Sequence, residues 1–371
     1  MTVELTPIGY SARPDAVRAA LDGATLVVST PSNIRWMTSF GGSLGWVVVG
    51  PDRMALITDG RYAERAVADL SAAGLEAAGV DVVVGTTRAE VRDHVVAVAG
   101  PGPVLAEAAH LTHAAWTDLA RDLDLQPDAG TVTRLRRVKD AGELHRMTLA
   151  ASIADGALTT VAPMLAEGPT EADVRDALES LMRRFGADGP SYDTIVASGP
   201  DNAARPHHQT GRRTIVEGDT VIIDVGALVD GYHSDMTRSY VIGDPTAEQV
   251  AVYDLVLAAQ LAGLDAVRPG AAGRDIDAAC RGLFAEAGYG DWYLHGTGHG
   301  VGLDIHEDPF SSTVSVDELV VGDVVTVEPG LYRGGFGGVR IEDLVAVTAD
   351  GGRRLTHLSK DTPCLPSPPT T

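Results

Sequence analysis

Five acidic and imidazole side chains in the C-terminal half of the chain interrupt or border apolar stretches, where packing alone would not place them. Asp224 lies within the apolar run 221–225, and Glu328 ends the run 324–327. An ionised carboxylate inside a strand core is costly unless it is paired or binds a metal. Carboxylates with an imidazole suit divalent cations, so the set predicts a two-metal site. The candidate metal ligands are Asp224, Asp235, His299, Glu328 and Glu342.

A two-residue turn brings two of these ligands together, although they are far apart along the chain. Asp230-Gly231 is a strong hairpin signal between two apolar-rich runs. With these residues as the loop, counting back along both strands places Asp224 opposite Thr237. Asp235 lies two residues from Thr237 and therefore on the same face of the sheet. We expect both carboxylates to approach one point from neighbouring strands.

The remaining candidates surround Glu342 and a glycine-rich histidine segment. By the two-residue period of a strand, Arg340 shares the face of Glu342 and could orient the carboxylates. His295, His299 and His306 lie among glycines that allow the backbone to approach a ligand closely. Six of the 11 histidines fall between residues 207 and 306, which favours a functional role for this cluster.

Composition limits the classes of partner. The chain has 371 residues and a formal charge of −22, which argues against nucleic acid or an anionic membrane as partner. Two distant cysteines, Cys280 and Cys364, are compatible with a reducing compartment. The start has no signal-peptide pattern, and no run approaches the ~20 apolar residues of a membrane span. We therefore expect a cytoplasmic protein.

The elements that must position the candidate residues fall into two domains, expected at 1–133 and 134–371. The first alternates helix and strand signals, which predicts a smaller α/β domain. Residues 126–137 are interpreted as the linker region. The second begins with a capping box at Asp140 and Glu143 and has further helix starts at Thr170 and Thr246. Its helices are segregated from its strands, which predicts an α+β domain. The strands are expected in 192–198, 220–229, 233–242, 322–328 and 338–347.

The ligand set resembles the dinuclear site of the pita-bread metallopeptidases, which include methionine aminopeptidase, aminopeptidase P and prolidase. Three further segments resemble the proline-specific branch (Xaa-Pro aminopeptidase and Xaa-Pro dipeptidase). They are residues 195–208 with Pro206-His207-His208, residues 231–238, and residues 295–307 followed by 338–343. The match is strongest over 192–345 and weaker in the first domain, at 33–40 and 58–62. The resemblance implies a C-terminal pita-bread (creatinase/aminopeptidase) domain after a creatinase-like N-terminal domain.

Carried over residue by residue, the resemblance assigns roles. Asp224 would bind one metal, Asp235 and Glu342 would bridge two, and His299 and Glu328 would complete the site. Glu328 would also shuttle a proton during attack by a metal-bridging hydroxide. His207 would lie near the scissile bond and His306 near the substrate carbonyl. His295 would shape the proline pocket, and His208, adjacent to His207, is the alternative to it. The implied activity is hydrolysis of the bond between an N-terminal residue and a following proline.

Several alternatives remain open at this point. Arg35, Arg61, Arg205 and Arg340 are candidates for binding a dipeptide carboxylate, so the sequence does not separate a dipeptidase from an aminopeptidase. A non-peptidase amidohydrolase on the same fold, acting on a small N-substituted compound, is compatible with the metal set. Methionine aminopeptidase is disfavoured by the extra first domain, and a binding protein without catalysis by the complete ligand set. The implied cofactors are two divalent ions, manganese first, with cobalt or zinc as alternatives. The family tendency is a homodimer.

Overall fold

The computed structural model describes residues 4–365, and the chain divides into two compact units. Of the described residues, the N-terminal unit comprises 6–136, and the C-terminal unit comprises 137–365 together with 4 and 5. The boundary expected at 133/134 falls inside a helix, α6 (Thr131–Arg136). The expected linker, residues 126–137, therefore contains regular structure, namely the end of β6 (Asp124–Pro127) and all of α6.

The N-terminal unit is built on one mixed six-stranded sheet in the order β4-β3-β2-β1-β5-β6. β2 and β3 pair antiparallel, while β3–β4, β1–β5 and β5–β6 are parallel. Its remaining strands are β1 (Thr25–Val28), β2 (Trp46–Val49), β3 (Met54–Asp59), β4 (Val80–Gly85) and β5 (Pro103–Ala106). Its other helices are η1 (Tyr10–Ala12), α1 (Arg13–Leu21), α2 (Pro31–Thr38), α3 (Ala63–Ala72), α4 (Arg88–Ala99) and α5 (His113–Leu119). The α/β prediction is confirmed.

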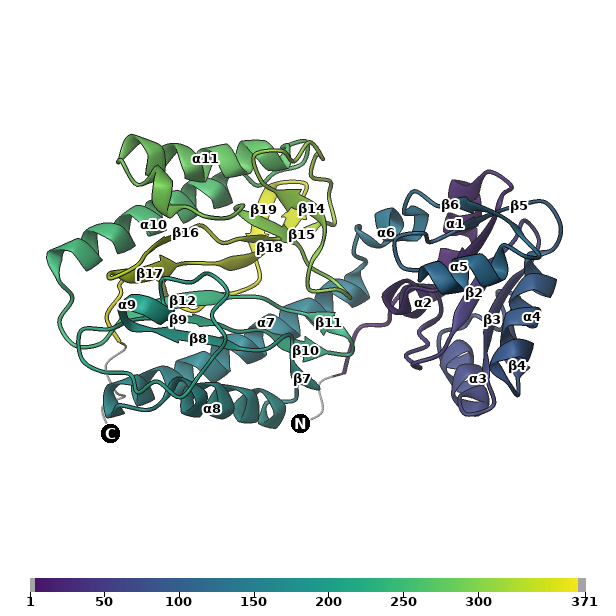
Figure 1. Ribbon diagram of the computed structural model, residues 1–371, viewed down its shortest axis with the longest axis horizontal. Coiled ribbons are helices and arrows are strands. Elements are labelled where there is room, and N and C mark those ends of the chain that lie inside the picture. The colour runs from purple at the N-terminus through teal and green to yellow at the C-terminus, as the bar shows by residue number, and fades with distance from the viewer. Residues whose placement is uncertain (1–3, 366–371) are drawn as a thin grey trace. The chain divides into compact units, whose positions relative to one another are not determined.

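Two pairs of long helices enclose the strands of the C-terminal unit, with α7 and α8 on one side and α10 and α11 on the other (Figure 1). Three of these helices begin at predicted capping boxes, on Asp140, Thr170 and Thr246. The helices are α7 (Ala141–Val161), η2 (Ala162–Glu167), α8 (Glu171–Arg184), α9 (Gly199–Asn202), α10 (Ala247–Ala266), α11 (Gly273–Glu286) and η3 (Gly290–Trp292). The apolar faces of α7 and α8 form one core cluster with the strands beside them.

The strands between these helices form four small sheets, in the orders β11-β10-β7, β12-β9-β8, β14-β13-β15-β18-β19 and β16-β17. Those of the first half are β7 (Gly189–Pro190), β8 (Ile195–Ser198), β9 (Thr220–Asp224), β10 (Ala227–Val229), β11 (Tyr232–His233) and β12 (Thr237–Val241). Those of the second half are β13 (Gly298–Gly300), β14 (Glu307–Ser311), β15 (Val324–Val327), β16 (Gly330–Arg333), β17 (Gly337–Arg340), β18 (Asp343–Thr348) and β19 (Gly351–Arg354). Antiparallel pairing dominates here, and the α+β prediction is confirmed.

The stretch Ala141–Glu167 is long and apolar enough to cross a membrane by length and composition alone. Half of its most apolar window is buried inside the unit. Ala150, Ala154 and Leu158 from this stretch belong to the core cluster shared with α8 and the adjacent strands. The stretch is therefore accounted for as the core helix of a folded unit.

Candidate metal centre

The first two candidate ligands lie on neighbouring strands in the predicted register. Asp230 and Gly231 both have positive φ, 45° and 76°, as a tight hairpin turn requires. β9 and β12 pair antiparallel with Asp224 opposite Thr237. The hydroxyl of Tyr192 contacts Oδ1 of both Asp224 and Asp235, so the two carboxylates converge on one point. The register predicted from the turn is confirmed.

The other three candidates come from the second half of the unit. His299 lies on β13, and its Nε2 is 3.6 Å from Asp235 Oδ2 and 3.5 Å from Glu328 Oε1. Thr237 Oγ1 donates a hydrogen bond of 2.7 Å to Glu342 Oε2 and so connects the two halves. Asp235, His299 and Glu342 each offer a ligand atom, and these atoms all lie within 4.8 Å of one another. The structure thus brings the predicted ligands to one place.

The chemistry of this donor set fits divalent cations. Burial, and next the Asp224 carboxylate, hold the pKa of Asp235 well above its usual range. Burial and the Asp235 carboxylate do the same to the pKa of Glu342, and burial raises the pKa of Glu328. Four candidate carboxylates, those of Asp224, Asp235, Glu328 and Glu342, therefore lie at one site. The guanidinium of Arg340 is paired with Asp224 there. Cations would offset the excess negative charge, and carboxylate oxygens with one imidazole are suitable ligands.

Arg340 supports the centre from behind the carboxylates. Its Nη2 donates to Asp224 Oδ2 at 2.5 Å and its Nε to Thr237 Oγ1 at 3.0 Å. Its Nη1 donates to the Tyr332 hydroxyl at 2.9 Å and to the Pro206 carbonyl at 3.1 Å. The side chain is only 4% exposed. Arg340 therefore orients a ligand and also fixes the backbone next to His207.

A cavity of about 1360 Å³ adjoins the ligand set. Besides the candidate ligand His299, four of the histidines named above line it, namely His207, His208, His295 and His306. The rings of His306 and His299 lie 4.3 Å apart, and burial together with His299 lowers the pKa of His306. His295 Nε2 is 3.0 Å from the Tyr332 hydroxyl, and burial lowers the pKa of His295 as well. Both lowered values favour neutral imidazoles at neutral pH.

The adjacent histidines 207 and 208 have different surroundings. His208 Nε2 is 3.0 Å from Oε2 of Glu171, a carboxylate with no exposed surface. Glu171 also accepts hydrogen bonds from Ser198, Asn202 and the Gly211 amide. Burial opposes its ionisation, but bonds from Asn202, Ser198 and His208 outweigh this and lower the pKa of Glu171. His208 is thus tied to the protein, whereas His207 is exposed on the cavity wall.

Two residues at the site carried no signal in the sequence. Tyr192 lies in an ordinary polar-apolar stretch, and only the fold places its hydroxyl between Asp224 and Asp235. Glu171 follows the capping residue Thr170 at the start of α8, where an acidic residue is explained by the helix end alone. A buried first-turn carboxylate is distinguishable from an exposed one only when the packing is known.

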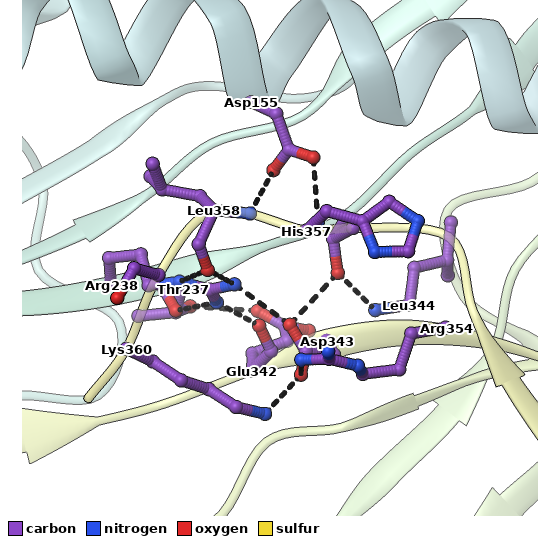
Figure 2. A network of polar contacts seen from close by, with 12 residues as sticks. Asp155, Thr237, Arg238, Glu342, Asp343, Leu344, Arg354, His357, Leu358 and Lys360 are labelled. Carbon is purple, nitrogen blue, oxygen red and sulfur yellow. Dashed lines mark hydrogen bonds and ion pairs between the residues drawn. The ribbon is translucent and has the colours of Figure 1, made fainter.

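A buried polar network lies behind Glu342 and is centred on its neighbour Asp343 (Figure 2). Asp343 Oδ1 is 2.8 Å from Nη2 of Arg238, and Oδ2 contacts Nζ of Lys360. Arg238 also donates to the carbonyls of Glu342 and Leu358. The segment 356–360 is thereby fastened to the strands that flank the candidate ligands Asp235 and Glu342.

Comparisons with known proteins agree with this geometry. The description "Metallopeptidase family M24" matches residues 145–349, and "Creatinase/Prolidase N-terminal domain" matches residues 15–138. The uncharacterised peptidase YqhT of Bacillus subtilis is 37% identical over 341 residues, which cover 92% of this chain and 95% of the relative.

Solved structures extend the likeness to the whole fold. The Xaa-Pro dipeptidase of Bacillus anthracis has a TM-score of 0.87 at 34% identity and covers 95% of this chain and 98% of its own. The X-Pro aminopeptidase of Thermotoga maritima has a TM-score of 0.82 at 28% identity, with coverages of 93% and 98%. The predicted resemblance is confirmed: this chain is a member of metallopeptidase family M24 with a creatinase/prolidase N-terminal domain and a pita-bread C-terminal domain.

Proposed function

We propose that the chain is a dinuclear-metal peptidase that hydrolyses the bond between an N-terminal residue and a following proline. The observation that carries the proposal is the convergence of Asp224, Asp235, His299, Glu328 and Glu342 beside a cavity lined by four further histidines. The Xaa-Pro dipeptidase and X-Pro aminopeptidase names of the similar structures support the choice of bond.

In this proposal, two divalent ions would be held by the five candidate ligands Asp224, Asp235, His299, Glu328 and Glu342. When bound, the metal pair supplies Lewis acidity that polarises the scissile carbonyl and lowers the pKa of a water molecule. The family supports divalent ions in general. We propose manganese, because a carboxylate-rich set with one imidazole suits it, with cobalt or zinc as substitutes.

The protein's own groups handle the protons and the substrate. Glu328, whose pKa is raised by burial, takes the proton of the attacking water and passes it to the leaving proline nitrogen. Neutral His306 donates a hydrogen bond to the carbonyl oxygen as negative charge develops there. His207 binds the substrate near the scissile bond, and His295, held by Tyr332, packs beside the proline ring. Arg340 acts indirectly, through Asp224 and the Pro206 carbonyl.

Proline specificity requires recognition of the ring, because a peptide bond before proline has no N–H to bind. The α-amino group of the substrate would lie near the carboxylates, so cleavage releases one N-terminal residue. We further propose that the enzyme acts as a homodimer, as the family resemblance implies, and that it acts in the cytoplasm.

Mass spectrometry of products tests the proposal directly. Manganese-loaded protein is incubated with Ala-Pro, Ala-Pro-Phe and Met-Ala-Ser. Release of alanine from either proline peptide, but no methionine, is the expected result. Release of methionine would indicate a methionine aminopeptidase instead. No cleavage of any peptide by protein with two bound metals would refute peptidase activity and favour another amide substrate. Asp235→Ala should be inactive, while Asp291→Asn, at an exposed position, is the matched control.

A further inference from the structure

The cavity beside the metal centre is larger than a dipeptide requires. Its volume of about 1360 Å³ exceeds the ~300–1,000 Å³ of ordinary ligand pockets. At one end it is bounded by buried ligands such as Asp235 and Glu342. At the other end, the lining residues come from α8, residues 193–195 and residues 310–317, and several of these are exposed. We call this second end the mouth.

The mouth is acidic. Asp176, Glu179, Asp193 and Asp317 line it, against the single cation of Arg175. Arg175 is already paired with Asp176, with Nη2 2.6 Å from Oδ1. The nearby field is therefore negative, and the net charge of the chain, −22, has the same sign.

The cavity offers little to bind a carboxylate at its inner end. No lysine is among the described residues that line it, and Arg175 and Arg340 are the arginines there. Four hydrogen bonds to protein atoms occupy Arg340. Apart from the metal ions proposed above, the described residues that line the cavity thus offer the free carboxylate of a dipeptide such as Ala-Pro more negative than positive charge.

The mouth also has apolar walls that remain open to solvent. Phe310, Val314 and Val316 line it and are 44%, 81% and 69% exposed. A lysine or arginine side chain suits such a surface, because its aliphatic stem packs on apolar groups while its charge reaches a carboxylate. Charge and shape therefore favour the same class of side chain.

We propose that the mouth binds the residues that follow proline in peptides longer than two residues, and that it selects basic over acidic residues there. The inference rests on the proposed function, because the N-terminal residue must lie at the metal centre for the rest of the peptide to extend toward the mouth. It deepens that function by naming the substrate class.

The first test compares kcat/KM for Ala-Pro, Ala-Pro-Lys-amide, Ala-Pro-Gln-amide and Ala-Pro-Glu-amide at low and high salt. We expect the lysine peptide to exceed the glutamate peptide by about tenfold at low ionic strength, with the difference shrinking in salt. The neutral peptide should fall between them, and all three should exceed Ala-Pro. Faster cleavage of Ala-Pro, or equal rates for lysine and glutamate, would overturn the subsite and leave the peptidase function standing. No cleavage of any peptide would overturn both.

A pair of double variants identifies the source of the preference. Asp176→Asn with Asp193→Asn removes two carboxylates from the mouth. Asp265→Asn with Asp350→Asn makes the same change in net charge at exposed positions that do not line the cavity. The Asp176→Asn, Asp193→Asn variant should reduce the lysine preference at least about threefold. The second should leave the preference intact. An unchanged preference in the first, or an equal loss in both, would contradict the proposal.

Discussion

Replacing Glu171 by glutamine tests how firmly the loop that carries His207 must be held. The change keeps the size of the side chain and removes its charge. Oε1 accepts from the Ser198 amide at 2.9 Å and from Asn202 Nδ2 at 2.9 Å, and an amide oxygen can still accept both. Oε2 accepts from the Gly211 amide at 3.1 Å and lies 3.0 Å from His208 Nε2. A glutamine NH2 group in the place of Oε2 would set one donor against another, because the Gly211 amide is also a donor.

The expected cost follows from these contacts. A hydrogen bond to a charged group contributes about 1.5–3 kcal/mol, and a buried donor left without a partner costs about 1–3 kcal/mol. We therefore expect Glu171→Gln to lower the free energy of unfolding by about 3 kcal/mol. If about 1.4 kcal/mol of this appears as misplacement of His207, kcat/KM falls about tenfold. The number of bound metals should not change, because Glu171 contacts none of the ligands.

The stability loss should depend on pH with a defined sign. The pKa of Glu171 is lowered in the folded state from its usual 4.5. Its contribution is therefore fully present above pH 4.5 and is lost as the pH falls through the lower folded value. The difference in unfolding free energy between wild type and variant should be largest at pH 7 and narrow in acid.

The assay is steady-state kinetics on a proline peptide, combined with urea denaturation and metal analysis. Glu167→Gln, at an exposed position four residues earlier, is the control and should match the wild type. His208→Gln should reproduce part of the effect, and the double variant should lose less than the sum of the single losses. Reduced stability with unchanged kcat/KM would refute the argument that Glu171 positions His207.

Three further changes test the centre and its support. Asp235→Ala should abolish binding of a metal pair and nearly all turnover, and mass-spectrometric metal analysis should find fewer than two metals per chain. Normal activity would contradict the assignment of Asp235 as a ligand. Tyr192→Phe removes the hydroxyl that contacts Asp224 and Asp235. It should weaken metal affinity about 10–100-fold, as measured by calorimetry. An unchanged affinity would show that Tyr192 does not orient these two carboxylates. Lys360→Met removes a buried partner of Asp343 and should cost about 3 kcal/mol in urea unfolding, whereas an unchanged midpoint would show that the pair contributes little.

The parts of the fold that depend on local rules were predictable from the sequence. The hairpin at Asp230-Gly231 fixed the register that joins Asp224 to Asp235, since a two-residue loop leaves one pairing in register. The capping boxes at Thr170 and Thr246 marked helix starts because their hydrogen bonds involve only neighbouring residues.

Features that depend on distant packing were not predictable. Asn202 and His208 meet Glu171 only after α8 packs against the strand and loop that follow it. The sequence also left open whether Arg340 contacts substrate, and its four protein partners come from four separate stretches of the chain. Residues 131–136, which looked like a linker, form a helix whose Val132 and Arg136 are buried.

The network around Asp343 has a consequence for the biosynthesis of the protein. Lys360 and the Leu358 carbonyl complete the polar shell behind Glu342, yet they are translated roughly 136 residues after Asp224. At about 5–20 residues per second, a ribosome needs about 7 to 27 s to cover that distance. The candidate ligand Asp224 therefore leaves the ribosome well before this polar shell is complete. For the dinuclear site proposed above, metal loading would accordingly follow synthesis of the C-terminal segment.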